Sequence, residues 1–355
     1  MIWSGIIDRY KKYLPVSDAT PIVSLNEGNT PLLFSRSLSD LLGASVYLKY
    51  EGMNPTGSFK DRGMTMALFK AAEAGSKMVI CASTGNTSAS AAAYAARAGI
   101  KSVVLIPKGA IALGKLSQAL IHKAQVISID GNFDKALQMV KEIARVRPIT
   151  LVNSLNPFRL EGQKTGAFEI CDQLGGQAPD FHSIPVGNAG NISAYWKGYK
   201  EYFEKKVISR KPVMLGFQAV GAAPIVKKRI IPDPKTVATA IKIGNPASWR
   251  MAEEARDESG GLIDAVTDQE ILNAYKWLAQ KDGVFVEPAS AASVAGIMKL
   301  HKKNYFKNTG TMAKKTIVCV LTGHGLKDPG CAIREIKKPK TVPAKLDALL
   351  EAIKI

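Results

Sequence analysis

Cysteines, acidic residues and long apolar runs are all scarce in this chain of 355 residues. Its four cysteines are far apart in the sequence and form no C-x-x-C pair, which disfavours a disulfide framework or a zinc site. No segment approaches the ~20 uninterrupted apolar residues that a membrane-spanning helix needs. Asp8 and Arg9 stand where a signal peptide has its apolar centre, so secretion is not expected. We therefore expect a cytoplasmic protein with reduced thiols and no membrane partner.

Acidic residues are outnumbered by basic ones, with 30 Asp and Glu against 48 Lys and Arg and a net charge of +18. A nucleic-acid-binding protein would gather these cations on one face or stripe. Here they are scattered mostly as singles and doublets, with small basic clusters at 227–229 and 337–338. We expect a solvated basic surface that helps to attract an anionic small substrate, and no nucleic-acid partner.

The chain has abundant apolar residues, at 46%, and 22% charged residues, which excludes disorder and at this length suggests about two domains. Short β-branched runs alternate with helical segments, a rhythm typical of βαβ units and mostly parallel sheets. The expected helices are 88–98, 133–145, 192–203 and 289–300, with a closing helix near 343–355. The expected strands are 46–50, 77–83, 102–107, 125–130, 149–153, 181–187, 214–220 and 316–322. The segment 225–248 is rich in Pro, Gly and Lys, and we expect it to be irregular.

Ligands of open α/β sheets bind where strands end and helices begin. At the first such corner, Asn54 to Ser58 form a turn, and a helix is expected to begin near Ser58. Lys60 would then lie in the first helical turn, where the helix dipole favours a neutral amine that can attack a carbonyl. The alternative is a surface lysine beside Asp61 and Arg62.

Two further corners favour anions. The hydroxyl-rich segment 83–88 exceeds what one helix cap requires and suits a carboxylate or phosphate. The small residues of 187–191 let backbone N–H groups close around a phosphate, although an ordinary Gly-rich turn is the alternative. A fourth corner, 321–329, ends a strand at Thr322 and contains His324, which is expected to be structural.

Other chemistries have weaker support. The segment 109–116 nearly matches a nucleotide-binding P-loop, but Leu116 replaces the hydroxyl that holds Mg²⁺. No Ser-His-Asp or Cys-His arrangement indicates hydrolysis, and no ligand cluster indicates a metal. The corners instead predict a phosphate-bearing cofactor that carries a reacting group.

Six motifs in the same order resemble the pyridoxal-phosphate enzymes of the tryptophan-synthase β type (fold type II), most closely the threonine synthase family. They are Glu27–Leu32, Asn54–Arg62, Ser83–Thr87, Gly187–Asn191, Glu287–Ser290 and Leu321–Pro329. Related dehydratases typically have a run of glycines at the phosphate loop and Ser or Cys near the pyridine nitrogen, and this chain departs from both patterns.

The resemblance implies a role for each matching position. Lys60 would be the catalytic Schiff-base lysine, Asn86 the partner of the ring hydroxyl of pyridoxal 5'-phosphate, and Thr322 the partner of its pyridine nitrogen. A neutral threonine hydroxyl makes the ring a tempered electron sink. The phosphate would be held by Gly187, Asn188, Ala189, Gly190 and Asn191. The substrate would be bound by Ser83, Thr84, Thr87, Asn153, Ser154 and Arg159, for which an exposed, salt-bridging arginine is the alternative.

The implied reaction converts O-phospho-L-homoserine and water to L-threonine and phosphate. The alternatives are a threonine or serine dehydratase, or a β-replacing enzyme such as cysteate synthase. The implied fold is two three-layer α/β domains with the cofactor in the cleft between them. Residues 1–52 and 154–355 would form the large domain, and 53–153 a small mobile domain. A homodimer is the family expectation.

Overall fold

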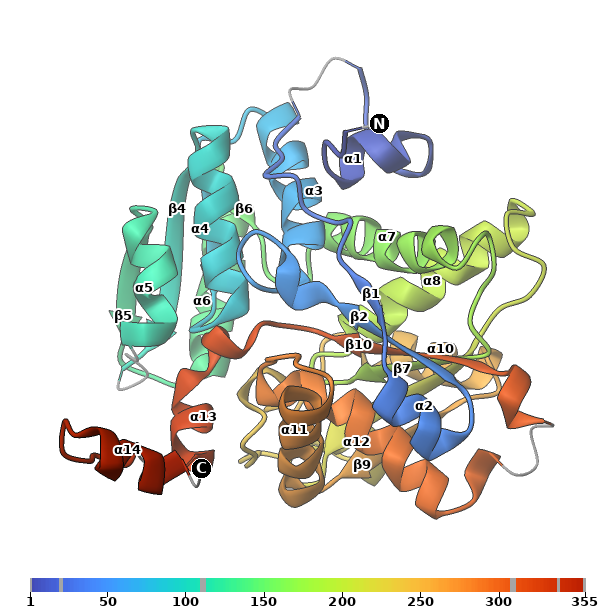
Figure 1. Cartoon of the computed structure of the whole chain (residues 1–355). Coiled ribbons are helices and arrows are strands. Elements are labelled where there is room, and N and C mark those ends of the chain that lie inside the picture. Colours follow the sequence, from blue (N-terminus) through green and yellow to red (C-terminus); the bar gives the residue numbers. More distant parts are fainter. Residues whose placement is uncertain (1, 19–21, 109–112, 307–310, 337–338, 354–355) are drawn as a thin grey trace.

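The structure is a computed structural model that describes residues 2–18, 22–108, 113–306, 311–336 and 339–353. Two separate β-sheets organise the chain (Figure 1). The larger sheet has the order β1-β2-β10-β7-β8-β9, and only the β1–β2 pair is antiparallel. Its strands are β1 (Leu32–Phe34), β2 (Ser45–Tyr50), β7 (Phe181–Pro185), β8 (Val213–Ala219), β9 (Leu262–Val266) and β10 (Thr316–Leu321).

The smaller sheet is entirely parallel, with the order β5-β4-β3-β6. Its strands are β3 (Met78–Ala82), β4 (Lys101–Pro107), β5 (Gln125–Ile129) and β6 (Thr150–Leu151). All of them fall within one continuous stretch of sequence, whereas the larger sheet combines segments from both sides of that stretch. The two sheets therefore follow the α/β plan that the alternating pattern predicts.

Helices cover both faces of each sheet. One apolar core of the larger sheet contains α2, α11 and α12, and the other contains α1, α7, α8 and α10. In the smaller sheet, α3, α4 and α5 contribute to one core and α6 to the other. These helices are α1 (Ile6–Tyr10), α2 (Arg36–Leu42), α3 (Lys60–Glu73), α4 (Asn86–Ala98), α5 (Leu113–Ile121), α6 (Phe133–Val146), α7 (Pro157–Gln173), α8 (Gly190–Glu204), α10 (Trp249–Glu258), α11 (Asp268–Lys281) and α12 (Pro288–Lys302). Three-layer packing is thus present in both halves.

The expected strands and helices are all present, with ends shifted by a few residues. Strands β1 and β9 were not predicted, because β1 is short and β9 carries Asp264 within its apolar run. Residues 225–248 are irregular, as expected, apart from the end of the short helix α9 (Pro224–Lys227) and one 3₁₀ turn at Thr239–Ile241. Of the P-loop-like segment, residues 109–112 lie outside the described residues.

Helices α13 (Pro329–Glu335) and α14 (Leu346–Ile353) follow the last strand, and α14 is the expected closing helix. Among the described helices, none combines the length and the apolar character needed to span a bilayer. The four cysteines are buried and free.

Helices α3 and α7 meet at an unusually close contact that places two candidate residues together. A Cβ on Gly162 of α7 would lie 1.9 Å from the backbone oxygen of Arg62 in α3, and one on Gly63 would lie 2.9 Å from the backbone oxygen of Arg159. Only glycine fits either position. The first turns of both helices, which carry Lys60 and Arg159, are consequently brought side by side.

Candidate active site

Lys60 is the first residue of α3, two residues later than the helix start predicted near Ser58. The segment before it pairs with the chain that follows β10: the Phe59 backbone N–H donates to the oxygen of Thr322 at 3.0 Å, and that of His324 donates to the oxygen of Gly57 at 2.9 Å. An isolated bridge between Ser58 and Gly323 completes this pairing. The first and fourth corners of the sequence therefore meet in one place.

The amine of Lys60 is held close to neutrality. Burial and the nearby Arg159 cation lower its pKa from 10.5 to about 7, against a smaller opposing effect of Glu287. Its Nζ lies 4.1 Å from the centre of the Phe59 ring. Burial and Arg159, rather than the helix dipole alone, thus produce the neutral amine that the sequence predicted.

The alternative of a surface lysine beside Asp61 and Arg62 is wrong, because Lys60 is partly buried and both of its neighbours are fully buried. Asp61 is fully buried and accepts hydrogen bonds from the Thr56 backbone at 2.7 Å and from the Thr56 and Ser90 hydroxyls, each at 2.6 Å. Arg62 is also fully buried, and it forms ion pairs with Glu51 and Glu169 at 2.7 and 2.9 Å. These buried hydrogen bonds and ion pairs of Asp61 and Arg62 hold the start of α3 in place.

The second corner forms the N-terminus of α4, which begins at Asn86. Its cap residue is Gly85, and no side chain caps the helix. The Ser83 hydroxyl accepts a hydrogen bond from the Gly85 backbone at 3.2 Å, and the side chains of 83–87 are only partly buried. The helix N-terminus and these accessible hydroxyls have the properties that the predicted anion site requires.

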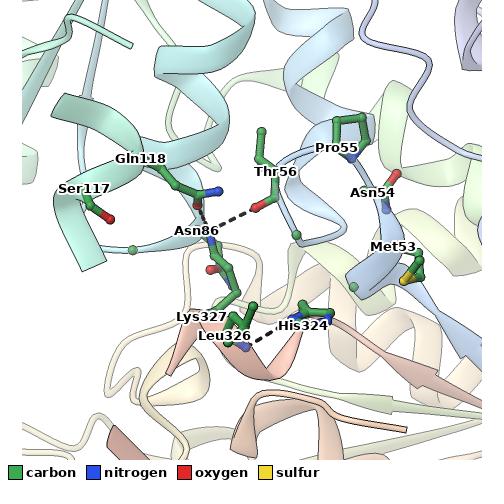
Figure 2. A pocket seen from close by; sticks show the side chains of 13 residues that line it. Met53, Asn54, Pro55, Thr56, Asn86, Ser117, Gln118, His324, Leu326 and Lys327 are labelled. Atoms are coloured by element: carbon green, nitrogen blue, oxygen red, sulfur yellow. Dashed lines mark hydrogen bonds between the residues drawn. The ribbon is translucent and has the colours of Figure 1, made fainter. Parts of the chain in front are cut away.

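A cleft of about 460 Å³ opens beside this corner. Figure 2 shows that Asn86, Thr56 and His324 line it from three different segments, with Gln118 of α5 at one side. Lys327, which the sequence analysis did not single out, bridges the cleft by donating to the Thr56 backbone oxygen at 3.1 Å and to the side-chain oxygen of Gln118. The cleft therefore lies between the smaller sheet's helices and the loop after β10.

The loop 187–191 leads into α8, and its backbone is shaped for close approach. Ala189 has a φ of 66°, and a Cβ on Gly187 would lie 2.9 Å from Cα of Ile241. The side chain of Asn188 accepts a hydrogen bond from the Ala247 backbone at 2.6 Å and donates to the hydroxyl of Ser154. Loop 187–191 is thus fixed in place at the start of a 15-residue helix.

Asn191 is consistent with the prediction that this loop receives a ligand. Its side chain is 8% exposed, and neither its amide nitrogen nor its amide oxygen has a hydrogen-bond partner within the described residues. A buried amide without partners costs roughly 1–3 kcal/mol, so such groups normally meet a ligand or water. A phosphate group at the helix N-terminus fits this amide and the neighbouring backbone N–H groups.

Arg159 lies at the start of α7 and is 1% exposed, so the alternative of an exposed, salt-bridging arginine is wrong. Its Nη1 donates to the Val152 backbone oxygen at 3.3 Å, while Nε and Nη2 have no partner within the described part of the chain. Burial lowers the pKa of Arg159 to about 10. A buried cation with two unused donors fits an anionic ligand.

Asn153 and His324, two further residues considered from the sequence, both use their side chains in hydrogen bonds to the backbone. The Asn153 side chain accepts from the Ala82 backbone N–H at 2.9 Å and donates to its oxygen at 3.0 Å, so it holds the end of β3. The His324 side chain accepts from the Leu326 backbone at 3.1 Å, in keeping with the structural role expected for it.

Glu287 lies within one of the six sequence motifs, but no role was predicted for it from the sequence. Its buried carboxylate accepts from the side-chain nitrogen of Asn86 at 3.2 and 3.0 Å and from the hydroxyl of Thr322 at 3.2 Å. The sequence does not indicate this position of Glu287 between two predicted cofactor ligands, because Thr322 lies about 35 positions and Asn86 about 200 positions away from it in the chain.

Comparison with known proteins shows the family to which the chain belongs. The family described as pyridoxal-phosphate dependent enzyme matches residues 23–323. A threonine synthase of Halalkalibacterium halodurans is 59% identical, covering 99% of this chain and 98% of its own length, and one of Mycobacterium bovis is 54% identical over 99% and 96%. The solved structure of maize serine racemase superposes with a TM-score of 0.73 at 21% identity, covering 99% and 98% of the two chains.

The two mostly parallel sheets and the likeness to solved enzymes of this kind define the fold type II architecture, and the chain belongs to the pyridoxal-phosphate dependent enzyme family. The identities of its relatives over nearly the full length place it, within that family, among the threonine synthases.

Proposed function

We propose that this chain converts O-phospho-L-homoserine and water to L-threonine and phosphate, with Lys60 as the lysine that carries the cofactor. The observation that supports this most directly is Arg159, a buried guanidinium with two unused donors, whose charge acts on Lys60. The reaction breaks the bond between the γ-carbon and the phosphate oxygen and adds water at the β-carbon. A substrate phosphate is the natural counter-ion for Arg159.

The cofactor and the substrate engage different groups in this proposal. Loop 187–191 and the N-terminus of α8 hold the cofactor phosphate, with Asn191 supplying its unpartnered amide. Asn86 and Thr322 face the ring from opposite domains. The substrate carboxylate lies on the N-terminus of α4, where Ser83, Thr84 and Thr87 add hydroxyls. The substrate phosphate binds Arg159, together with Asn153 and Ser154.

Bound pyridoxal phosphate supplies an electron sink for the electrons released at the substrate α-carbon. With a pKa of about 7, the Lys60 amine is about half neutral at pH 7, so it can accept the α-proton and return it at a neighbouring carbon. Arg159 meanwhile neutralises the leaving phosphate. Burial of Arg159 and partial burial of Lys60 limit access of bulk water to the reacting atoms.

One assay separates this function from its nearest rivals. The purified holoenzyme should release inorganic phosphate from O-phospho-L-homoserine and form threonine in equal amounts. A threonine dehydratase would instead form 2-oxobutyrate from threonine, and a cysteate synthase would replace phosphate on phosphoserine by sulfite. Activity in either of those assays without threonine formation would contradict the proposal.

We further propose that residues 53–153 form a small domain whose sheet moves against the rest of the chain, 1–52 and 154–355, and closes on the substrate, while the start of α3 stays fixed on α7. The support is that the smaller sheet is built only from residues 78–151, while Lys327 and Glu287 reach across to Gln118 and Asn86 through polar contacts. Such contacts can break and re-form during closure. We also propose a cytoplasmic homodimer.

A further inference from the structure

We propose that Glu287 is a positioning residue, which fixes the direction of the hydrogen bonds that Asn86 and Thr322 offer to the cofactor ring. This inference rests on the proposed function, because it assumes that Lys60 carries the cofactor between these two side chains.

The contact between Glu287 and Asn86 determines which end of the amide faces the cleft. Both carboxylate oxygens of Glu287 lie within 3.2 Å of one terminal atom of Asn86. An ionised carboxylate can only accept hydrogen bonds, so that atom must be the NH₂ group. One of its two hydrogens is engaged by Glu287, and the second is left to donate. Asn86 therefore offers a donor to an oxygen on the cofactor ring, and cannot flip without losing its carboxylate partner.

The hydroxyl of Thr322 belongs to the same chain of hydrogen bonds. Its Oγ1 lies 3.2 Å from Oε1 of Glu287 and 3.0 Å from the hydroxyl of Ser290. This series of hydrogen bonds ends on a carboxylate that can only accept. The hydrogen of Thr322 is therefore directed to Glu287, and the oxygen of Thr322 retains its lone pairs. Glu287 thereby sets the orientation in which the Thr322 hydroxyl meets the ring nitrogen, where a neutral hydroxyl keeps the ring a tempered electron sink.

The backbone holds the carboxylate in this position. The Glu287 backbone N–H donates to the oxygen of Gly323 at 3.0 Å, and the Gly323 N–H donates to the hydroxyl of Ser290 at 2.9 Å. A Cβ on Gly323 would lie 2.6 Å from Oε1 of Glu287, so the close approach needs glycine. Glu287 also stands at the N-terminus of the 15-residue helix α12, where a negative charge is favoured.

The polar groups around Glu287 are suited to an ionised carboxylate, on which the direction of these hydrogen bonds depends. Burial leaves the pKa of Glu287 above its usual value, although hydrogen bonds from Asn86 and Thr322 and the positive charges of Lys327 and Lys60 offset part of that increase. Every polar side chain recorded against it in the described residues is a donor or a cation. The carboxylate thus links a ligand on α4 to one that follows β10.

The test is a set of double-mutant cycles read by cofactor binding rather than turnover. Glu287→Gln keeps the size of the side chain but adds a donor. We expect it to weaken pyridoxal-phosphate binding by about tenfold and to shift the visible absorbance band of the bound cofactor. In an Asn86→Ala background, and again in Thr322→Val, we expect the additional effect of Glu287→Gln to fall to about threefold or less. Glu254→Gln on the exposed face of α10 is the matched control and should change neither readout.

Each outcome has a definite meaning. An unchanged band and affinity in Glu287→Gln would overturn the inference, as would fully additive effects in both backgrounds. Far-ultraviolet circular dichroism and the thermal midpoint of the cofactor-free variants separate a local effect from misfolding, and Gly323→Ala, which displaces the carboxylate without removing its charge, should reproduce the band shift. If the wild-type holoenzyme itself shows no lysine-bound cofactor, the proposed function fails instead.

Discussion

At the residue scale, burial and a neighbouring positive charge, rather than a hydrogen bond, lower the pKa of Lys60 and favour its neutral amine. An ordinary lysine is almost entirely protonated at pH 7, since its pKa is about 10.4. Burial and Arg159 lower the pKa of Lys60 to about 7, which increases its neutral fraction by roughly three orders of magnitude. The arginine that we propose as the partner of the substrate phosphate therefore also lowers the pKa of the lysine.

This gives a pH dependence for loading of the cofactor. Only the neutral amine attacks an aldehyde, so the rate at which pyridoxal phosphate attaches to the cofactor-free chain should rise with pH and level off above about 7. Stopped-flow absorbance measures this rate. Borohydride reduction and peptide mapping should locate the label on Lys60, and Lys60→Ala is the control. A rate that keeps rising to about pH 10, as for an ordinary lysine, would contradict the lowered pKa.

Replacement of Arg159 should separate binding from stability. Arg159→Leu removes two unused donors and a buried charge, so we expect KM for O-phospho-L-homoserine to rise at least about tenfold while cofactor affinity is retained. Without ligand, the thermal midpoint should not fall, because a buried charge without an ion-pair partner contributes little stability. Steady-state kinetics and calorimetry measure both effects, with Arg250→Leu on the exposed face of α10 as the control. An unchanged KM would remove Arg159 from the phosphate pocket.

At the scale of elements, the crossing of α3 and α7 determines where the reactive side chains meet. Gly162 packs directly on the backbone of α3, and the axis-to-axis distance must stay short for Arg159 to reach Lys60. The buried ion pairs of Arg62 with Glu51 and Glu169 lock the same turn of α3 against α7 and the end of β2. The helix start that carries Lys60 is thereby held by both packing and charge.

Gly162→Ala should consequently be far more damaging than its size suggests. The new Cβ would lie 1.9 Å from a backbone oxygen, which no side-chain rotation relieves. We expect a loss of about 3 kcal/mol or more in the free energy of unfolding, measured by urea denaturation. Gly330→Ala in α13 is the matched control, since its Cβ would meet only ordinary contacts at 3.4 Å and beyond. Equal stability of the two variants would argue against the close crossing.

The sequence predicts those elements whose pattern is local. Strands such as β4 and β10 are apolar runs, and helix α4 is an Ala-rich segment after a turn, so both are predictable from neighbours in the chain. Strand β9 was missed because Asp264 interrupts its apolar pattern, and only the tertiary ion pair with Lys299 at 2.9 Å shows why the charge is tolerated.

The site shows the same limit. The corner positions of Lys60 and of loop 187–191 follow from motifs, whereas the bridging role of Glu287 depends on contacts between residues distant in sequence. The surface-lysine alternative failed for a similar reason, since nothing local indicates that Asp61 and Arg62 are buried.

At the scale of the whole molecule, one buried ionic network joins segments from three parts of the chain. Lys49 and Arg62 both contact Glu169, at 2.6 and 2.9 Å, and the backbone N–H groups of Asn29 and Thr30 donate to the same carboxylate at 2.9 and 2.8 Å. Burial alone would raise the pKa of Glu169, but Arg62 and Lys49 outweigh it and bring the pKa to about 2. The network is therefore a source of acid sensitivity.

The sign of this effect follows from proton linkage. Because the pKa of Glu169 is lower in the folded chain than in the unfolded chain, its contribution is complete above about pH 4.3 and disappears as the pH falls through about 2. The contribution amounts to about 3 kcal/mol. Glu169→Gln should lose that part of the pH dependence and be less stable at neutral pH, because two buried cations lose their partner. Urea unfolding at several pH values measures both effects, with Glu254→Gln as the control; an unchanged acid limb would contradict the assignment.

Helix α14 carries an exposed apolar stripe that is a candidate for the interface of the proposed homodimer. Helix α14 lies at the edge of the molecule in Figure 1 and presents Leu346, Leu349, Leu350 and Ile353 at helical spacing, each between 37% and 70% exposed. An apolar stripe of this kind is typical of an interface, and a second copy of this chain is the occupant that the proposed homodimer supplies. Light scattering should give twice the chain mass, and Leu346→Glu with Leu350→Glu should shift it toward the monomer while Val146→Glu, at an exposed end of α6, should not. A dimer that survives the double change would place the interface elsewhere, and a monomeric wild type would contradict the homodimer itself.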